Sequence, residues 1–142
     1  MQFFLAGIMQ GSLVELSIHD QSYRDALRDV LRARFPGATV FCPLELNPNS
    51  VGYTTGEARA CFFAMIEEAT RSDLVIAYLP SASMGTAVEM YAAHQAGVPI
   101  VSISPLAENW AVKLLSRAVV PSLEAFEVFV RDGGIERILD LR

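Results

Sequence analysis

The sequence predicts an α/β protein in which helices cover both faces of a parallel sheet. Short apolar runs alternate with longer helical patterns along all 142 residues, and this order of elements builds parallel sheets. The run from Asp73 to Leu79 is almost continuously apolar, as is typical of a strand buried on both faces. With right-handed crossovers, these patterns predict a flavodoxin-like or Rossmann-like doubly wound sheet of about five strands in three layers.

Five stretches have the composition of strands, because each is rich in β-branched or aromatic residues. They are residues 2–6, 38–42, 73–79, 100–103 and, as a short fifth strand, 118–120. Gly7 follows the first of them and allows a close approach to the backbone. Ligands of doubly wound sheets bind outside the carboxyl ends of the strands. The loops expected at that edge are residues 7–12, 43–55, 79–89 and 104–110.

The helices expected between these strands are residues 23–34, 56–71, 83–96, 110–116, 121–130 and 133–140. In the first helix apolar residues recur at helical spacing, and its four arginines and two aspartates are interpreted as a solvated face. Residues 44–55 are expected to form a polar loop, and loops of this length are often functional. Pro121 is expected in the first turn of its helix. The residues of helix 56–71 expected to be buried are Phe62, Phe63, Met65, Ile66 and Ala69.

Composition narrows the classes of function. The chain is expected to form a single domain over residues 1–142, and its net charge of −5 argues against nucleic-acid polymers and anionic membranes as partners. Cys42 and Cys61 form no CxxC motif, so we expect two buried thiols in a reducing cytosol, with no metal site and no cofactor. His19 and His94 are isolated and are interpreted as structural or exposed. The first residues lack a basic leader, which favours a cytoplasmic protein.

A single acid, Glu89, follows the segment Ser83-Met84-Gly85-Thr86 in the first turns of helix 83–96. Unpaired N–H groups and partial positive charge make a helix N-terminus suitable for an anion or a sugar. Ser83 can cap this helix, and Gly85 lets a ligand approach the backbone, although capping and packing alone also explain both residues. A carboxylate at residue 89 can attack a sugar carbon or stabilise an oxocarbenium-like centre. The plainer interpretation is a surface glutamate.

Two aromatic residues lie in loops near the same edge. Tyr53 and Trp110 could stack on a base, and packing in the core or in a lid explains them equally well.

Four segments together resemble the nucleoside 2-deoxyribosyltransferase family, which includes nucleoside 5′-monophosphate N-glycosidases. They are FFLAG at residues 3–7, SDLVIAYLP at 72–80, S-x-G-T-x-x-E at 83–89 and AGVPI at 96–100. The resemblance is strongest over residues 73–104. It implies a flavodoxin-like fold, cleavage of an N-glycosidic bond by hydrolysis or transfer, and a homodimer or higher homo-oligomer. It also implies a small-molecule nucleoside or nucleotide as partner.

The resemblance assigns roles to individual residues. It implies that Glu89 acts at the anomeric carbon and that the substrate is bound by Gly7, Ile8, Ser83, Met84, Gly85 and Thr86. The transferases carry an Asp where this chain has Ser83, and the monophosphate hydrolases carry Ser, so Ser83 favours a phosphate over a free hydroxyl.

The chain departs from the family at three places. The family's early tyrosine falls on Phe4, its phosphate-binding Arg and Ser fall on Gln10 and Ile8, and an acid on the helix before the third strand falls on Met65. These departures motivate a second hypothesis, a catalytically weak or inactive module of the same fold that binds a nucleotide or related metabolite.

Two further alternatives concern the missing acid and the family. Glu67 or Glu68 could replace the acid missing at residue 65. The stretch from Gly85 to Glu89 also resembles the second half of a motif of cytokinin-activating phosphoribohydrolases, whose paired glycines are absent from Leu79-Pro80-Ser81. Both family resemblances imply the same type of bond. A purely structural oligomeric protein is the third hypothesis.

Overall fold

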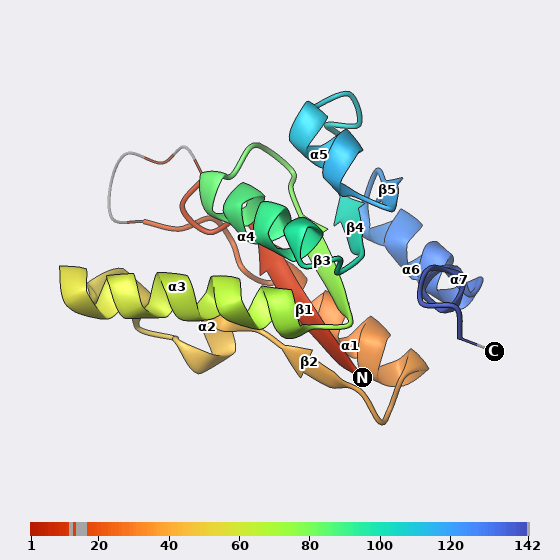
Figure 1. Ribbon diagram of the computed structural model, residues 1–142, viewed down its shortest axis with the longest axis horizontal. Coiled ribbons are helices and arrows are strands. Elements are labelled where there is room, and N and C mark those ends of the chain that lie inside the picture. Colours follow the sequence, from red (N-terminus) through yellow and green to blue (C-terminus); the bar gives the residue numbers. More distant parts are fainter. Residues whose placement is uncertain (12, 14–16, 142) are drawn as a thin grey trace.

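The computed structural model describes residues 1–11, 13 and 17–141. Within them, five parallel strands form one sheet in the order β2-β1-β3-β4-β5 (Figure 1). The strands are β1 (Gln2–Gly7), β2 (Thr39–Phe41), β3 (Leu74–Tyr78), β4 (Ile100–Ile103) and β5 (Ala118–Val120). This is the flavodoxin-like order, with its topological switch point between β1 and β3. The predicted fold class and the five predicted strands are confirmed.

Helices form a layer on each face of the sheet (Figure 1). One layer contains α1 (Tyr23–Arg34), α6 (Leu123–Arg131) and α7 (Gly134–Ile138), and the other contains α3 (Thr55–Arg71), α4 (Met84–Gln95) and α5 (Trp110–Leu115). The alternation of side chains along β1 explains this division. Phe3 and Leu5 pack against the α1 layer, whereas Phe4 and Ala6 pack against the α4 layer.

Two expected elements differ in the structure. The predicted polar loop 44–55 contains a short helix, α2 (Pro43–Leu46), and a 3₁₀ turn, Ser50–Gly52. Pro43 occupies the first position of α2, where its fixed φ favours a helix. Pro121 lies before α6 and not in its first turn, because Ser122 caps this helix by accepting a hydrogen bond from the Ala125 N–H at 3.2 Å.

The burial predicted for helix α3 is wrong for its two phenylalanines. Phe62 and Phe63 are 45% and 59% exposed and form an edge-to-face pair. Of the predicted buried residues only Ala69 is buried, and Met65 and Ile66 are half-buried. The reason is geometric, since the N-terminal half of α3 projects past the strands (Figure 1). None of the described helices is both long and apolar enough to cross a membrane.

Candidate functional site

A cavity of about 380 Å³ opens at the carboxyl end of β1, between the loop that follows this strand, helix α3 and the N-terminus of α4. We call it the Glu89 cavity. Five of the predicted site residues line it together: Gly7, Ser83, Met84, Gly85 and Glu89. Loops 7–11 and 43–53 contribute to its wall, as the sheet order predicts. Ser12, at the end of the predicted 7–12 loop, lies outside the described residues.

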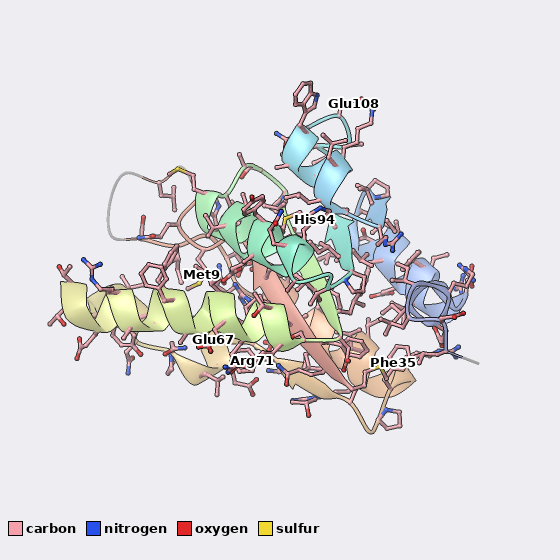
Figure 2. All side chains as sticks on the ribbon, viewed as in Figure 1. Met9, Phe35, Glu67, Arg71, His94 and Glu108 are labelled. Carbon is pink, nitrogen blue, oxygen red and sulfur yellow. The ribbon has the colours of Figure 1, made fainter. Side chains whose placement is uncertain are left out.

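The opposite wall comes from α3 and from the segment before it. Ala58, Cys61, Phe62 and Met65 face the cavity from α3, and Met9 lies between α3 and α4 (Figure 2). The sequence pattern missed Cys61 and Phe62 as site residues, because an apolar helix residue is more often part of a core. The signal that could have found them is the scarcity of charge in the segment from Ala60 to Ile66, which leaves the helix apolar on more than one face.

Two polar side chains break this apolar wall. The Tyr53 hydroxyl donates a hydrogen bond to Asn47 Oδ1 at 3.2 Å, and Asn47 Nδ2 donates to the Pro43 carbonyl at 3.1 Å. Both side chains line the cavity. They therefore supply a fixed phenol and a fixed amide opposite the N-terminus of α4.

Helix α4 begins at the cavity with a serine cap. Ser83 Oγ accepts the Thr86 N–H at 3.3 Å and lies 2.9 Å from Thr86 Oγ1. Thr86 is buried and does not line the cavity, so its side chain serves the cap. A Cβ placed on Gly85 would meet no atom within 4 Å, so the space beside this residue is open. A ligand can therefore approach the first turn of α4 closely.

Glu89 lies half-buried in the cavity, on the second turn of α4. Burial raises the pKa of its carboxyl to about 8, and the nearby Arg24 guanidinium opposes this rise. The carboxyl is therefore mostly protonated at neutral pH and becomes ionised as the pH rises through about 8. A pKa this far from the ordinary value of 4.5, in a cavity, is typical of functional carboxyls.

Among the described residues, the Cys61 thiol and the metal-ligating side chains are the other candidates for reactive groups. Burial, together with the charge of Glu89, raises the pKa of the Cys61 thiol, which keeps it protonated. In the described part of the chain, no three His, Cys, Asp or Glu side chains gather as metal ligands.

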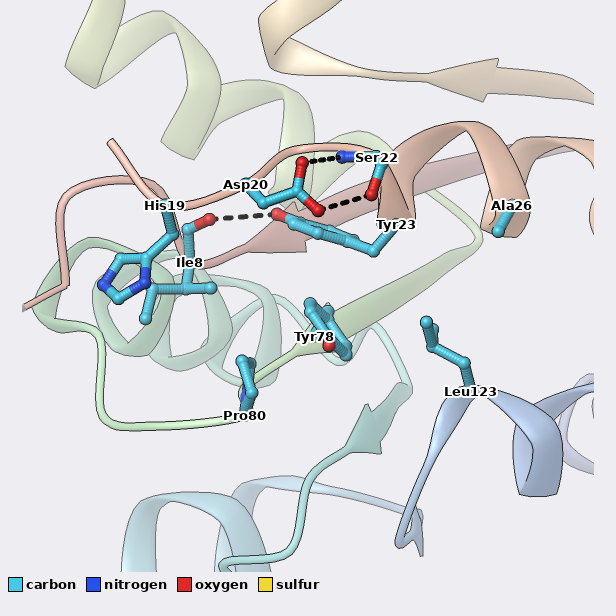
Figure 3. Close-up of a pocket in the computed structure, with 9 residues that line it drawn as sticks. All are labelled: Ile8, His19, Asp20, Ser22, Tyr23, Ala26, Tyr78, Pro80 and Leu123. Atoms are coloured by element: carbon cyan, nitrogen blue, oxygen red, sulfur yellow. Dashed lines mark hydrogen bonds between the residues drawn. The ribbon is translucent and has the colours of Figure 1, made fainter. Parts of the chain in front are cut away.

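A second cavity of about 380 Å³ lies on the α1 side of the same strand ends (Figure 3). Ile8 lines it in place of the Glu89 cavity, so the structure does not join Ile8 to the other predicted site residues. The polar side chains of this second cavity bond to one another, since the Asp20 carboxylate accepts hydrogen bonds from the Ser22 N–H and hydroxyl (Figure 3). His19 also lines it.

The remaining predicted residues are placed as follows. Tyr53 lines the Glu89 cavity, whereas Trp110 is 79% exposed at the first residue of α5 and lies outside the lining. His94 is exposed. Phe4 stacks on Phe41 in the core with ring centroids 5.6 Å apart, and Met65 leaves its position in the cavity wall apolar.

Neither acid near Met65 fills this gap. Glu67 pairs with Arg71 on the outer side of α3 (Figure 2). Glu68 accepts a hydrogen bond from Gln2 Nε2 at 3.3 Å, at the amino end of β1 and away from the cavity. Glu89 is therefore the carboxyl that lines the cavity within the residues the structure describes.

The sequence matches no protein-family profile and no curated protein. Solved structures share its fold. A 2-deoxyribosyltransferase from Bacillus psychrosaccharolyticus superposes with a TM-score of 0.65 at 21% identity, covering 89% of this chain and 90% of the other. A conserved protein from Enterococcus faecalis gives 0.63 at 19% identity, with 93% and 98% covered.

A CMP N-glycosidase, BcmB, from Clostridium botulinum gives a TM-score of 0.52 at 16% identity, with 92% of this chain and 98% of the other covered. At these identities the likeness establishes the fold. This chain therefore has the flavodoxin-like fold that a 2-deoxyribosyltransferase and an N-glycosidase also use.

Proposed function

We propose that this protein cleaves the N-glycosidic bond of a nucleoside or a nucleoside 5′-monophosphate, with Glu89 acting at the anomeric carbon. The observation that carries the proposal is the position of Glu89, a half-buried carboxyl with a raised pKa in a cavity that opens beside the capped N-terminus of α4. The fold shared with a 2-deoxyribosyltransferase and a CMP N-glycosidase supports it.

The chemistry requires the ionised carboxyl. The Glu89 carboxylate attacks the anomeric carbon while the bond to the base nitrogen breaks, and the base leaves after taking a proton from water. Water then hydrolyses the glycosyl ester in a hydrolase, or a second base displaces the carboxylate in a transferase. The positive charge that develops on the sugar favours the ionised form of Glu89 in the transition state.

The walls of the cavity suit the two ends of such a substrate. Ser83, Met84 and Gly85, at the start of α4, would hold the sugar or its 5′-phosphate by N–H groups and a hydroxyl. The Thr86 hydroxyl supports Ser83 through the contact between their oxygens, and the backbone of Gly7, at the end of β1, forms the adjoining wall. The apolar α3 wall, with Tyr53 and Asn47, would face the base.

A binding module without turnover is the second candidate. Met65 favours it, because the described lining of the cavity holds one carboxyl, whereas glycosidic cleavage by paired acids needs two. Tight binding of a nucleotide in calorimetry without release of base would support this candidate over the enzyme.

The exposed face of α3 and α4 favours a homodimer. Phe62, Phe63, Val88 and Tyr91 are each more than 40% exposed, and α3 and α4 are in extensive contact. Exposed apolar patches of this kind mark interaction surfaces. A second copy placed on them would also close the side of the Glu89 cavity formed by Phe62 and Met84.

The two free cysteines fit a reducing, cytoplasmic location.

The test is incubation of the protein with a panel of nucleosides and 5′-monophosphates, with free base measured by chromatography. We expect base release by the wild type and none by Glu89→Ala. Equal release by both proteins, or none by the wild type from any member of the panel, would contradict the assignment.

A further inference from the structure

Arg24 is a cation buried inside the α1 layer. The sequence pattern predicts that Arg24 belongs to a solvated helix face, but in the structure Arg24 is only 3% exposed. Its guanidinium donates to the carbonyls of Leu5 at 3.0 Å and Gly7 at 3.3 Å, and to Gln21 Oε1 at 2.7 Å. Arg24 forms no ion pair with a carboxylate that the structure describes, although burying a charge is costly unless it is compensated.

The end of β1 separates this guanidinium from the Glu89 cavity. Gly7 accepts a hydrogen bond from Arg24, and the same residue lines the cavity with Glu89. Helices α1 and α4 cover opposite faces of the sheet. Arg24 and Glu89 therefore lie on the two sides of the sheet at the end of β1, and among the described residues no hydrogen bond or ion pair joins them.

Phenols and a thiol are among the other titratable groups around Glu89. On α1, burial raises the pKa of the Tyr23 phenol far above neutrality. On α3, the Cys61 thiol also has a raised pKa. The Tyr53 phenol belongs to the segment before α3 and donates to Asn47. Among the described groups, Arg24 is thus the one whose positive charge acts on the Glu89 carboxyl.

We propose that Arg24 is a positioning residue whose buried guanidinium is the counter-charge for the Glu89 carboxylate across the end of β1. It stabilises the ionised form of Glu89 through space, and it fixes the carbonyls of Leu5 and Gly7 that form the adjoining strand end. Its importance for turnover rests on the proposed function. The electrostatic relation between the two residues exists without substrate and can be measured separately.

The direct test is an NMR titration of Glu89 with ¹³C-labelled glutamate, using Glu89→Gln to assign its resonance. In Arg24→Met the midpoint should rise by about one pH unit, the low end of the effect of a neighbouring charge. Arg32→Met is the matched control, because Arg32 is exposed on the same helix and the net charge changes equally. Its midpoint should equal that of the wild type. An unchanged midpoint in folded Arg24→Met would overturn the proposal.

A second measurement avoids the risk that Arg24→Met does not fold. In the wild type, the Nε–H resonance of Arg24 should shift with pH at the midpoint of Glu89, and in Glu89→Gln this shift should be lost. If the chemical shift of Arg24 Nε–H does not change at the midpoint of Glu89, the proposal is also overturned.

The outcomes separate the two proposals. Linked titrations without base release would leave the role of Arg24 standing and remove the proposed function. Base release that depends on Glu89, with unlinked titrations, would do the reverse.

Discussion

The hydroxyl of Tyr23 lies against the backbone of Gly7, at the point where β1 ends and the Glu89 cavity begins. A Cβ on Gly7 would approach Tyr23 Oη to 2.2 Å. The hydroxyl donates a hydrogen bond to the Ile8 carbonyl at 3.1 Å, and the ring packs on Tyr78 with centroids 4.2 Å apart. Tyr23 is therefore held on two sides, and the strand end needs a residue without a side chain.

Gly7→Ala should destabilise the protein by about 1–3 kcal/mol, the usual cost of overpacking a core. The added methyl group would collide with a buried ring that Tyr78 prevents from moving. Chemical denaturation measures the loss of unfolding free energy.

Gly85→Ala is the control for this change. The added methyl group meets open space in the first turn of α4, where Ala is at least as favourable as Gly. Stability should be equal or higher. If Gly7→Ala had the same free energy of unfolding as Gly85→Ala, the contact between Gly7 and Tyr23 would be contradicted.

Glu89→Gln should stabilise the folded protein, and the gain should depend on pH. The pKa of Glu89 is raised from 4.5 to about 8 on folding. Between these values the unfolded chain is ionised while the folded carboxyl keeps its proton, so the wild type loses stability as the pH rises. The gain in Glu89→Gln should be absent below about pH 4.5, grow up to about pH 8 and then stay constant.

The size of this gain should be on the order of 3 kcal/mol, after allowance for the partial exposure of Glu89. Urea denaturation of both proteins over this range of pH measures it. A constant difference between the two proteins at every pH would show that the pKa of Glu89 is ordinary.

Ser83→Ala should cost about 1 kcal/mol of stability, because the Thr86 N–H loses its acceptor. It should also weaken nucleotide binding, because Ser83 lines the cavity. Ser122→Ala is the matched control, since Ser122 caps α6 in the same way but lies outside the lining. Calorimetry with a nucleoside 5′-monophosphate should show weaker binding only in Ser83→Ala. Equal affinities would contradict a ligand at the start of α4.

Phe63→Glu should convert a dimer to a monomer, because it puts charge into the exposed apolar face of α3. Val128→Glu is the control on α6, where Val128 is 44% exposed in the opposite layer. Sedimentation should give a dimer for the wild type and for Val128→Glu. A wild type that is monomeric at all concentrations would remove the proposed interface.

The sequence pattern predicts the sheet well, because buried strands of a parallel sheet leave a clear signal. The run from Leu74 to Tyr78 is apolar at every position, and turn residues bound it. The cap at Ser83 and the carboxyl at Glu89 are also predictable from local spacing. Both belong to the start of one helix, α4, and for this reason they lie together at the cavity.

Contacts between residues far apart in the chain cannot be predicted from local sequence patterns. The sequence around Arg24 is that of an amphipathic surface helix, and only the acceptors at Leu5 and Gly7 explain its burial. In the same way, Phe62 and Phe63 are apolar enough for a core, but α3 extends beyond the sheet that would cover them. Ile8 follows the last residue of β1 and lines the cavity on the α1 side, which the strand pattern alone does not predict.

The most direct measurement of the central claim is the pH dependence of kcat/KM for base release by the wild type and Glu89→Gln. Because kcat/KM reports the ionisation of the free enzyme, it should rise with pH through the pKa of Glu89, about 8. Glu89→Gln should lose the activity at every pH. Base release that Glu89→Gln retains, with the same pH profile as the wild type, would contradict a role for this carboxylate at the anomeric carbon.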